Sequence, residues 1–541
     1  MIYIKNASCF DEIKINSQLL FYTAKAQKAP FITSFEAALN PACYRNQFDA
    51  FAYVIINQKT QEFLLVRDHL GMQPLFYAYQ AASKTLVFGE TMPDVLAELN
   101  PKPAILDAEA RGEFIEPRVY ADQTLYQGIY RVEPGHMMHG KPNGELTKKV
   151  FWQLEQAGET LYYQDKREYL EHFSELMSNA IQDATHGFNH VAAEFSAGVD
   201  STAVYLASTE RGLNPTLFMH AATPDSRSAK SYNTGAEDKF YQHYQPNIHR
   251  IDADNFDPIA VFRQYSKYFA GPAPYIFEAF AHPLHAEVSK GKHDVLLSGF
   301  GGDQGVSGHV PLRFILPELL RNKAFSRAFE ALSSHTLRRR LLQCIQYSHP
   351  ITHRLIQSGQ DLKAVVTNVW KSDSNKRLIS VYPQQRDYFK TLREAEWQSL
   401  QGPASHEIRM RIESSSIVAK KMGFEYRYPL LHPKLLEFYL SLPLSEKRHE
   451  GAGRYLIRRY LARYLPASIF DDYQKKTGLN ILPATMDLYK TKYSEGAYQE
   501  AFHGLPYPEL VQDKLEHMTM VKSARAFMLK SWQADYRQIG L

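Results

Sequence analysis

The sequence predicts an α/β protein of two parts, in which an antiparallel β-rich part precedes a doubly wound parallel sheet with a helical C-terminal region. Short alternating apolar segments separated by turns fill the first third of the chain. Near Gln156 the pattern changes to strands that alternate with helices, and after Gly308 it is mostly helical. Alternating strands and helices are typical of parallel sheets, whereas successive hairpins form antiparallel ones.

The elements of the first part are short strands rich in β-branched and aromatic side chains. A helix should follow them at 91–100, because Pro93 suits its first turn and the Asn100-Pro101 pair ends it. The strands are expected at 48–57, 62–71, 74–80 and 84–90.

The second part alternates between helices and strands. An amphipathic helix is expected at 167–186, and another at 200–212, where Gly212 ends it. The short apolar segments that we interpret as strands are 190–198, 215–223, 247–254 and 293–302. The boundary therefore falls at about residues 152 to 165. The predicted domains are 1–155 and 165–541, the latter with a helical insertion at 310–400.

Composition limits the classes of function. Lys and Arg number 62 and Asp and Glu 58, and the resulting net charge of +4 is too small for a general nucleic-acid or membrane binder. The three cysteines lie far apart, which fits a reducing compartment. No apolar run approaches the roughly 18 to 20 residues of a membrane span, and the first residues lack a signal-peptide pattern. We expect a soluble cytoplasmic protein.

One segment departs from this balance. Residues 322–343 are basic and amphipathic. A solvated helix face is the usual meaning of such a charge run. The alternative is a docking surface for an acidic partner or a leader peptide, and the sequence leaves both open.

A first candidate ligand-binding motif is Ser196-Ala-Gly-Val-Asp-Ser201, which leaves a predicted strand and opens a helix. Small residues let the backbone approach a phosphate, and the helix N-terminus offers free N–H groups. Ser196 and Ser201 can add hydroxyl donors, and Asp200 can hold a magnesium ion. A tight turn with a helix cap is the alternative for this motif alone.

A second candidate motif, Ser298-Gly-Phe-Gly-Gly-Asp303, also leaves an apolar strand. Ligands of open parallel sheets bind beyond the carboxyl ends of the strands. Asp303 could therefore face Asp200 as a second magnesium ligand, since magnesium on phosphates needs one or two carboxylates. A flexible loop with an incidental carboxylate is the alternative.

Together the two motifs resemble those of the asparagine synthetase family, which has an SGGxDS loop and, later in the chain, an SGxGxDE motif. The resemblance covers nearly the whole chain. It implies a glutaminase-like αββα sandwich of the Ntn-hydrolase type, followed by an ATP-pyrophosphatase domain of the HUP type. The segments that match the family in order are 48–57, 64–78, 87–101, 124–138 and 411–443.

The resemblance implies that ATP and Mg²⁺ activate a carboxylate as an acyl-adenylate, releasing pyrophosphate, and that an amine then attacks to form an amide. By position, Asp200 and Asp303 resemble the magnesium ligands. The residues that match nucleotide-binding positions are Phe195, Ser196, Ala197, Gly198, Val199, Asp200, Ser201, His220, Ser298 and Gly299.

Two further positions match catalytic ones. Residues 473–479 resemble the catalytic lysine loop, in which the spacing favours Lys476, with Lys475 as the alternative. Glu413 matches the glutamate of the tyrosine–glutamate pair in β-lactam synthetase, which implies a general base. A glutamate on a helix surface is an equally good interpretation. Glu425 and Arg427 are expected to form a structural pair.

The chain also departs from asparagine synthetase. The family's glutaminase uses an N-terminal cysteine, whereas residue 2 is Ile2 and Cys9 is internal. We therefore expect residues 1–155 to keep the fold without glutaminase activity. Phe300 stands where asparagine synthetase has a glutamate, Gln304 replaces an acidic residue, and Ala197 replaces a glycine, which is costly if its φ is positive.

These departures resemble the glutaminase-free branch, such as lasso-peptide macrolactam synthetase and β-lactam synthetase. The resulting hypothesis is an AMP-forming amide ligase that acts on a peptide or small-molecule carboxylate, with a precursor peptide and its protease as candidate partners. We expect no nucleic-acid or membrane partner, and a homodimer is the candidate assembly. The alternatives are an asparagine synthetase and, in another class, a nucleotide-binding pseudoenzyme or scaffold.

Overall fold

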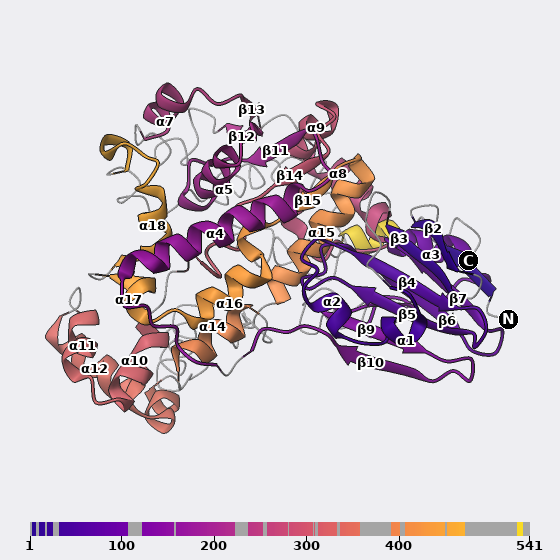
Figure 1. Cartoon of the computed structure of the whole chain (residues 1–541), viewed down its shortest axis with the longest axis horizontal. Coiled ribbons are helices and arrows are strands. Elements are labelled where there is room, and N and C mark those ends of the chain that lie inside the picture. The colour runs from indigo at the N-terminus through magenta and orange to yellow at the C-terminus, as the bar shows by residue number, and fades with distance from the viewer. Residues whose placement is uncertain are drawn as a thin grey trace, which may run out of the picture.

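The computed structural model shows two layered parts packed side by side (Figure 1). The N-terminal part lies at one end and the helical segments α10 to α12 lie at the other. The residues that the structure describes are 3–6, 10–16, 19–24, 32–105, 122–155, 158–221, 236–252, 257–279, 281–306, 308, 312–332, 336–356, 391–400, 406–449, 452–470 and 527–533.

Two sheets form the N-terminal part. The six-stranded sheet is antiparallel throughout and has the order β10-β9-β5-β4-β3-β2. Its strands are β2 (Phe10–Asn16), β3 (Leu19–Ala24), β4 (Ala52–Asn57), β5 (Glu62–Arg67), β9 (His136–Gly140) and β10 (Leu146–Val150). The four-stranded sheet, β1-β7-β6-β8, contains β1 (Tyr3–Asn6), β6 (Phe76–Gln80), β7 (Thr85–Gly89) and β8 (Tyr130–Arg131).

Alternation along these strands builds the sandwich. Val54 and Ile56 of β4 pack with Tyr77 of β6 and Phe88 of β7, whereas Tyr53 and its neighbours on the other face belong to a second core. The outer helices are α1 (Phe35–Ala38), α2 (Ala42–Arg45) and α3 (Met92–Glu98). The expected αββα sandwich is therefore confirmed, and the pattern of residues 48–100 located four of its strands and α3.

A five-stranded parallel sheet forms the centre of the second part. Its order is β13-β12-β11-β14-β15, and every neighbouring pair is parallel. The strand order reverses between β11 and β14, as in doubly wound folds. The strands are β11 (Val191–Glu194), β12 (Thr216–Ala221), β13 (Ile248–Asp252), β14 (Val295–Leu297) and β15 (Glu425–Arg427). The predicted doubly wound sheet is confirmed.

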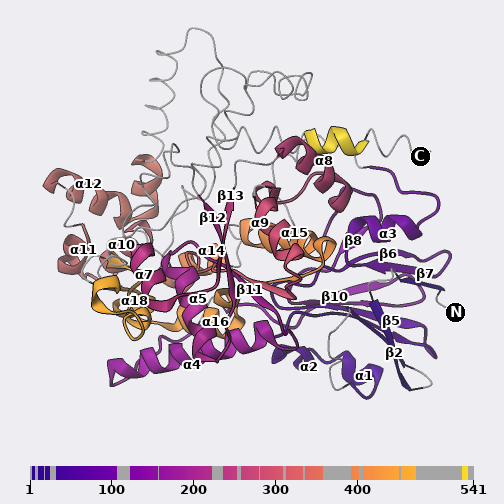
Figure 2. The ribbon, with the colours of Figure 1, turned by 90° about the horizontal axis from the view of Figure 1, so that it is seen from above.

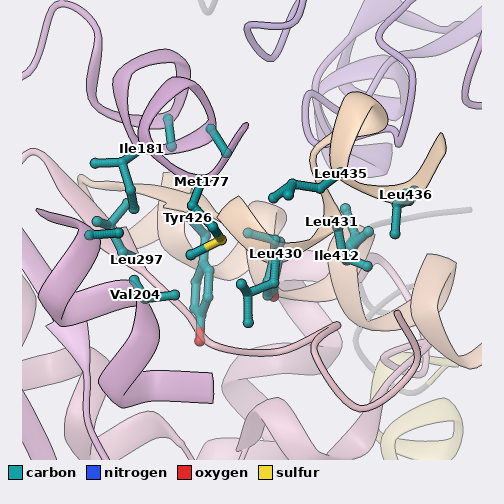
Figure 3. Packing of buried hydrophobic residues seen from close by; sticks show 14 of the residues in the cluster. Met177, Ile181, Val204, Leu297, Ile412, Tyr426, Leu430, Leu431, Leu435 and Leu436 are labelled. Atoms are coloured by element: carbon teal, nitrogen blue, oxygen red, sulfur yellow. The ribbon is translucent and has the colours of Figure 1, made fainter. Parts of the chain in front are cut away.

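Helices cover both faces of this sheet (Figure 2). On one side α4 (Lys166–Thr185) packs on α5 (Val199–Glu210), and on the other α9 (His282–Lys290) and α15 (His406–Met422) cover β12, β13 and β15. The core between them includes Met177 and Ile181 of α4, which lie beside Leu297 and Tyr426 of adjacent strands (Figure 3). A close-packed core of this kind holds the loops at the ends of the strands in fixed positions.

The remaining elements are mostly helical, as the pattern after Gly308 predicts. Among the helices of the described residues, none is long and apolar enough to cross a membrane. The remaining elements are α7 (Ala236–Tyr244), α8 (Pro258–Phe269), η2 (Ile276–Ala279), α10 (Leu312–Arg321), α11 (Phe325–Ala331), α12 (Leu337–Ser348), α14 (Leu392–Leu400), η5 (Pro429–Leu431), α16 (Pro433–Ser441), α17 (Leu444–Lys447), β16 (Arg448–His449), β17 (Ala452–Gly453) and α18 (Tyr455–Leu461).

Candidate active site at the reversal of strand order

The two glycine-rich motifs lie side by side. Residues 196–201 follow β11 and residues 298–303 follow β14, and these strands are hydrogen-bonded neighbours. The carboxyl ends of parallel strands open at the same edge of the sheet, and the reversal of strand order leaves a crevice there. The fold thus brings together two loops that stand far apart in the sequence.

The first loop turns sharply into α5. Ala197 has φ +50°, in the left-handed region, where a side chain costs roughly 1–2 kcal/mol. The backbone of Ala197 therefore has the positive φ that makes alanine costly at this position. The loop is braced by the Ser196 backbone N–H, which donates to Ser201 Oγ at 3.2 Å. The next residue, Gly198, caps α5, so the first N–H groups of that helix face the loop edge.

The glycines of the second loop allow direct packing on the first. A Cβ on Gly299 would lie 2.7 Å from the backbone nitrogen of Ser201, and one on Gly302 would strike the carboxylate of Asp200. Such distances to backbone atoms cannot be relieved by rotating a side chain. Glycine is therefore required at Gly299, where the close atoms belong to the backbone, for the two loops to stay in contact.

The two aspartates share one cation. Arg454, at the start of α18, forms an ion pair with Asp303, and its Nη1 lies 3.9 Å from Asp200 Oδ2. The Arg454 side chain is only 5% exposed, whereas Asp303 is 58% exposed. Arg454 also has φ +62°. Non-glycine residues in that region are held there by their surroundings and are frequent at functional sites. The sequence carried no signal that singled out Arg454.

Phe195, which is buried directly after β11, and His220, which lies in β12, are the two positions expected to contact the adenosine. Phe195 packs among Tyr205, Phe240 and Tyr241 with ring centroids 5.1–6.3 Å apart. His220 ends β12, and its Nδ1 is buried with no hydrogen-bond partner among the described residues. Burial lowers the pKa of His220, against the attraction of Glu194, so its ring is neutral near pH 7.

A buried polar cluster lies beside the second loop, and sequence analysis did not identify it. Ser298 Oγ donates to Glu194 Oε2 at 2.5 Å, and the Tyr426 hydroxyl donates to the same carboxylate. Arg411 Nη2 lies 3.9 Å from Glu194, and its Nε lies 3.8 Å from Glu278 Oε1. These groups come from β11, the loop after β14, β15, α15 and η2, so only the fold assembles them.

Glu278 is the most perturbed carboxyl group of this cluster. Burial, which outweighs the nearby Arg411 charge, raises the pKa of Glu278 to about 8. Its Oε2 lies 3.7 Å from His285 Nε2, and burial lowers the pKa of that histidine to about 3. A neutral imidazole therefore faces a carboxyl group that can exchange a proton near neutral pH, and such groups are frequent at active sites.

Phe300 has a specific partner. The guanidinium carbon of Arg411 lies 4.1 Å from the centre of the Phe300 ring, and Tyr428 meets the same ring edge-on at 5.7 Å. A cation over an aromatic face is attracted to it by roughly 0.5–2 kcal/mol. The residue that distinguishes this chain from asparagine synthetase thus orients an arginine instead of supplying a carboxylate.

Glu413 lies elsewhere. Its oxygens lie 3.2 Å from Arg67 Nη1 and 3.2 Å from Arg131 Nη1, all three side chains being buried. Both arginines belong to the N-terminal part. On α15 a residue two positions after Arg411 points the opposite way. The general-base role of Glu413 stays a prediction, and these contacts weigh against it because they join the two parts of the molecule.

The structure describes the Glu425–Arg427 pair, but it does not describe the lysine loop or Cys9. Arg427 Nη1 lies 3.0 Å from Glu425 Oε2, and Lys420 Nζ lies 3.0 Å from its Oε1, as expected of a structural pair. Against the effect of burial, Lys420 and Arg427 lower the pKa of Glu425 to about 2. Lys475 and Lys476 lie outside the described residues, as does Cys9, so their roles stay predictions.

Comparison with known proteins agrees with this geometry. The sequence model of the asparagine synthase family matches residues 172–532, more than half of the chain. The glutamine amidotransferase domain model matches residues 32–152.

Curated relatives are distant. Amidase chry2 of Gibberella zeae is 22% identical over 49% of this chain and 40% of its own length. Amidase chyE of Penicillium rubens is 26% identical over 28% of this chain and 22% of its own. The putative glutamine-hydrolysing asparagine synthetase 2 of Methanocaldococcus jannaschii is 19% identical over 57% and 59%. The chain thus spans less than two thirds of the length of each of these relatives.

Proposed function

Because the chain belongs to the asparagine synthase family, we propose that it is an ATP-dependent synthetase that joins a carboxylate to an amine as an amide. One observation carries the proposal. Asp200 and Asp303 meet at Arg454, beside two loops whose glycines let them pack directly against each other. Two carboxylates and one buried arginine suit a magnesium ion and a pyrophosphate group.

The residues of the chain fit ATP and Mg²⁺. Asp200 and Asp303 would hold the metal, and the N-terminus of α5 with Ser196 and Ser201 would hold phosphate oxygens. The buried rings around Phe195 and the unpartnered Nδ1 of His220 would receive the base. When bound, ATP supplies the adenylyl group that turns a carboxylate oxygen into a leaving group.

The cluster around Arg411 would handle the reacting groups. Arg411 can attract the incoming carboxylate, and Phe300 keeps its guanidinium in place. Glu278 and Glu194 are the carboxyl groups that face Arg411, so one of them is proposed to take the proton of the attacking amine. Lys476, or Lys475, is proposed to neutralise the charge that develops during adenylation.

We further propose that the amine comes from the substrate itself and not from glutamine, as in a peptide macrolactam or another specialised cyclisation. The chemistry of the described cysteines supports this. Cys43 Sγ donates to the Ala37 carbonyl oxygen at 3.2 Å, and burial raises the pKa of Cys344. Burial thus disfavours the thiolate of Cys344. Phe300 disfavours aspartate plus ammonia, since it can neither accept nor donate a proton.

The test begins with the alternative substrate. The purified protein is incubated with ATP, Mg²⁺, aspartate and ammonium, and pyrophosphate and asparagine are measured. With aspartate and ammonium, the proposal expects neither product. With an added peptide that carries an Asp or Glu side chain and a free N-terminus, it expects release of pyrophosphate and loss of one water from the peptide. Formation of asparagine would identify an asparagine synthetase instead.

The Asp200→Ala variant is the matched control for both reactions, since it removes a proposed metal ligand. The same protein is also incubated with glutamine alone, and release of glutamate that Cys9→Ala abolishes would refute the glutaminase-free proposal. Binding of ATP without any product from aspartate or a peptide panel would instead favour a nucleotide-binding scaffold.

A further inference from the structure

Exposed apolar side chains gather on one part of the molecule. Of the eleven large hydrophobic residues that are exposed in the described residues, seven lie between positions 325 and 355. Their exposed fractions run from 51% to 67%. Monomeric proteins rarely leave a group of this kind uncovered, and such patches mark interaction sites. The seven are Phe325, Leu337, Leu341, Leu342, Ile345, Ile351 and Leu355.

Helix α12 carries apolar residues on both faces. Its inner face, with Cys344 and Tyr347, packs on the small core of Leu316, Ala328 and Leu332. Its outer face holds Leu337, Leu341 and Ile345 at four-residue spacing, which lines them up along the helix. Apolar side chains on two faces of one helix are normally covered on both faces. The outer face of α12 therefore lacks a cover within the described residues.

Positively charged residues predominate in this region. Residues 312–356 contain eight Lys and Arg against two Glu, although the whole chain has a net charge of only +4. Residues 336–356 contain four arginines and no acidic residue. Arg338 and Arg339 are exposed and form no ion pair within the described part of the chain. The guanidinium of Arg340 lies over the Phe329 ring at 5.4 Å.

We propose that this surface docks an acidic, amphipathic segment of a protein partner. The α12 surface is defined by Leu337, Arg338, Arg339, Leu341, Leu342, Ile345, Ile351 and Leu355. The apolar residues would receive the partner's apolar stripe, and the arginines would pair with its carboxylates. Arginine presents a planar fork that can bind a carboxylate through two hydrogen bonds. Apolar side chains at helical spacing beside such arginines fit an amphipathic helix of a protein partner.

The position of the surface agrees with docking. Helices α10, α11 and α12 form one end of the molecule, far from the N-terminal sandwich, in both views (Figures 1 and 2). A partner bound there would lie at the opposite end of the molecule from the N-terminal sandwich (Figure 1). If this helix were only a solvated basic helix, the exposure of four of its aliphatic side chains to water would have no explanation.

The test uses a synthetic peptide of 18 residues whose helix has leucines on one face and glutamates on the other, labelled for fluorescence anisotropy. We expect a dissociation constant in the micromolar range that weakens as salt is added. Leu341→Ser with Ile345→Ser should weaken binding at least tenfold, and so should Arg338→Glu with Arg339→Glu. Tyr162→Ser is the matched control, because Tyr162 is 77% exposed elsewhere on the chain.

Three results would overturn the proposal. A peptide with lysines in place of the glutamates could bind as well, which would remove the charge argument. Vesicles of phosphatidylserine could bind through the same residues while the acidic peptide does not, which would make the surface a lipid contact. A dimer that Leu341→Ser with Ile345→Ser dissociates would make the occupant a second copy. None of these measurements depends on the proposed reaction.

Discussion

Glu278 shows how one buried side chain makes stability depend on pH. Its pKa is raised to about 8, so the folded protein holds a proton that the unfolded chain releases near its ordinary value of 4.5. Between these values the unfolded state binds fewer protons, and the stability contribution of Glu278 falls as pH rises. Above about pH 8 the loss is complete.

The corresponding prediction compares Glu278→Gln with the unchanged protein. Because glutamine carries no titrating proton, the variant should gain stability relative to the unchanged protein from pH 5 to pH 8, by a few kcal/mol at most. His285, Arg411 and Glu194 face this carboxyl group in both proteins, so their effects largely cancel. Thermal unfolding midpoints across this pH range give the result, and parallel curves would contradict it.

Arg454 is the residue on which the two aspartates converge. Replacing it with methionine keeps the length of the side chain and removes the charge that faces a bound pyrophosphate. Charge-assisted hydrogen bonds contribute about 1.5–3 kcal/mol, so the affinity for ATP with Mg²⁺ should fall about tenfold or more. Isothermal titration calorimetry measures it, with Arg463→Met as control since Arg463 bonds to Ser174 on the surface. Equal affinities of Arg454→Met and the unchanged protein would refute the role.

At the scale of elements, contact between two loops is what builds the site. The N-terminus of α5 and the turn after β14 meet at Gly299. A Cβ atom added to Gly299 would lie 2.7 Å from the backbone nitrogen of Ser201. Since two backbones approach each other there, the contact cannot adjust by a rotamer change.

Gly299→Ala should therefore separate the loops and abolish measurable nucleotide binding while the protein stays folded. Circular dichroism verifies the fold, and equilibrium binding of ATP with Mg²⁺ gives the outcome. Gly187→Ala is a demanding control, because Gly187 has φ +81° but open space around its Cβ position. A Gly299→Ala protein that binds as tightly as the control would show that the loops do not cooperate.

At the scale of the whole molecule, a buried ion-pair triad joins the two parts. Glu413 is held between Arg67 and Arg131, and Arg67 also donates to the carbonyl oxygens of Gln73, Val132 and Gly71. Removing one partner of a buried pair leaves an uncompensated charge, which costs about 3–5 kcal/mol.

Glu413→Ala should accordingly lower the unfolding midpoint strongly, and Glu437→Gln, a change at a partly exposed pair with Lys434, should alter it little. Denaturation followed by tryptophan fluorescence measures both. If Glu413→Ala instead kept full stability and lost only amide formation, the catalytic-base prediction for Glu413 would be restored.

The sequence by itself determined many of the elements and the two glycine-rich loops that follow β11 and β14. Alternation in residues 48–90 and small residues after apolar strands are local signals, and they located β4 to β7, residues 196–201 and residues 298–303. Such signals lie within a few consecutive residues, so they can be recognised without knowing what packs around them. The pairing of Glu425 with Arg427 was also local, because the two stand on the same strand face.

Only the tertiary structure decided which side chains meet. Arg411 and Glu413 are two positions apart on α15, yet one turns to Glu194 and Glu278 and the other to Arg67. Arg454 reaches Asp200 and Asp303 from a helix more than a hundred residues away in sequence. Such contacts depend on how the layers pack, since a helix face becomes functional only through the element that packs against it.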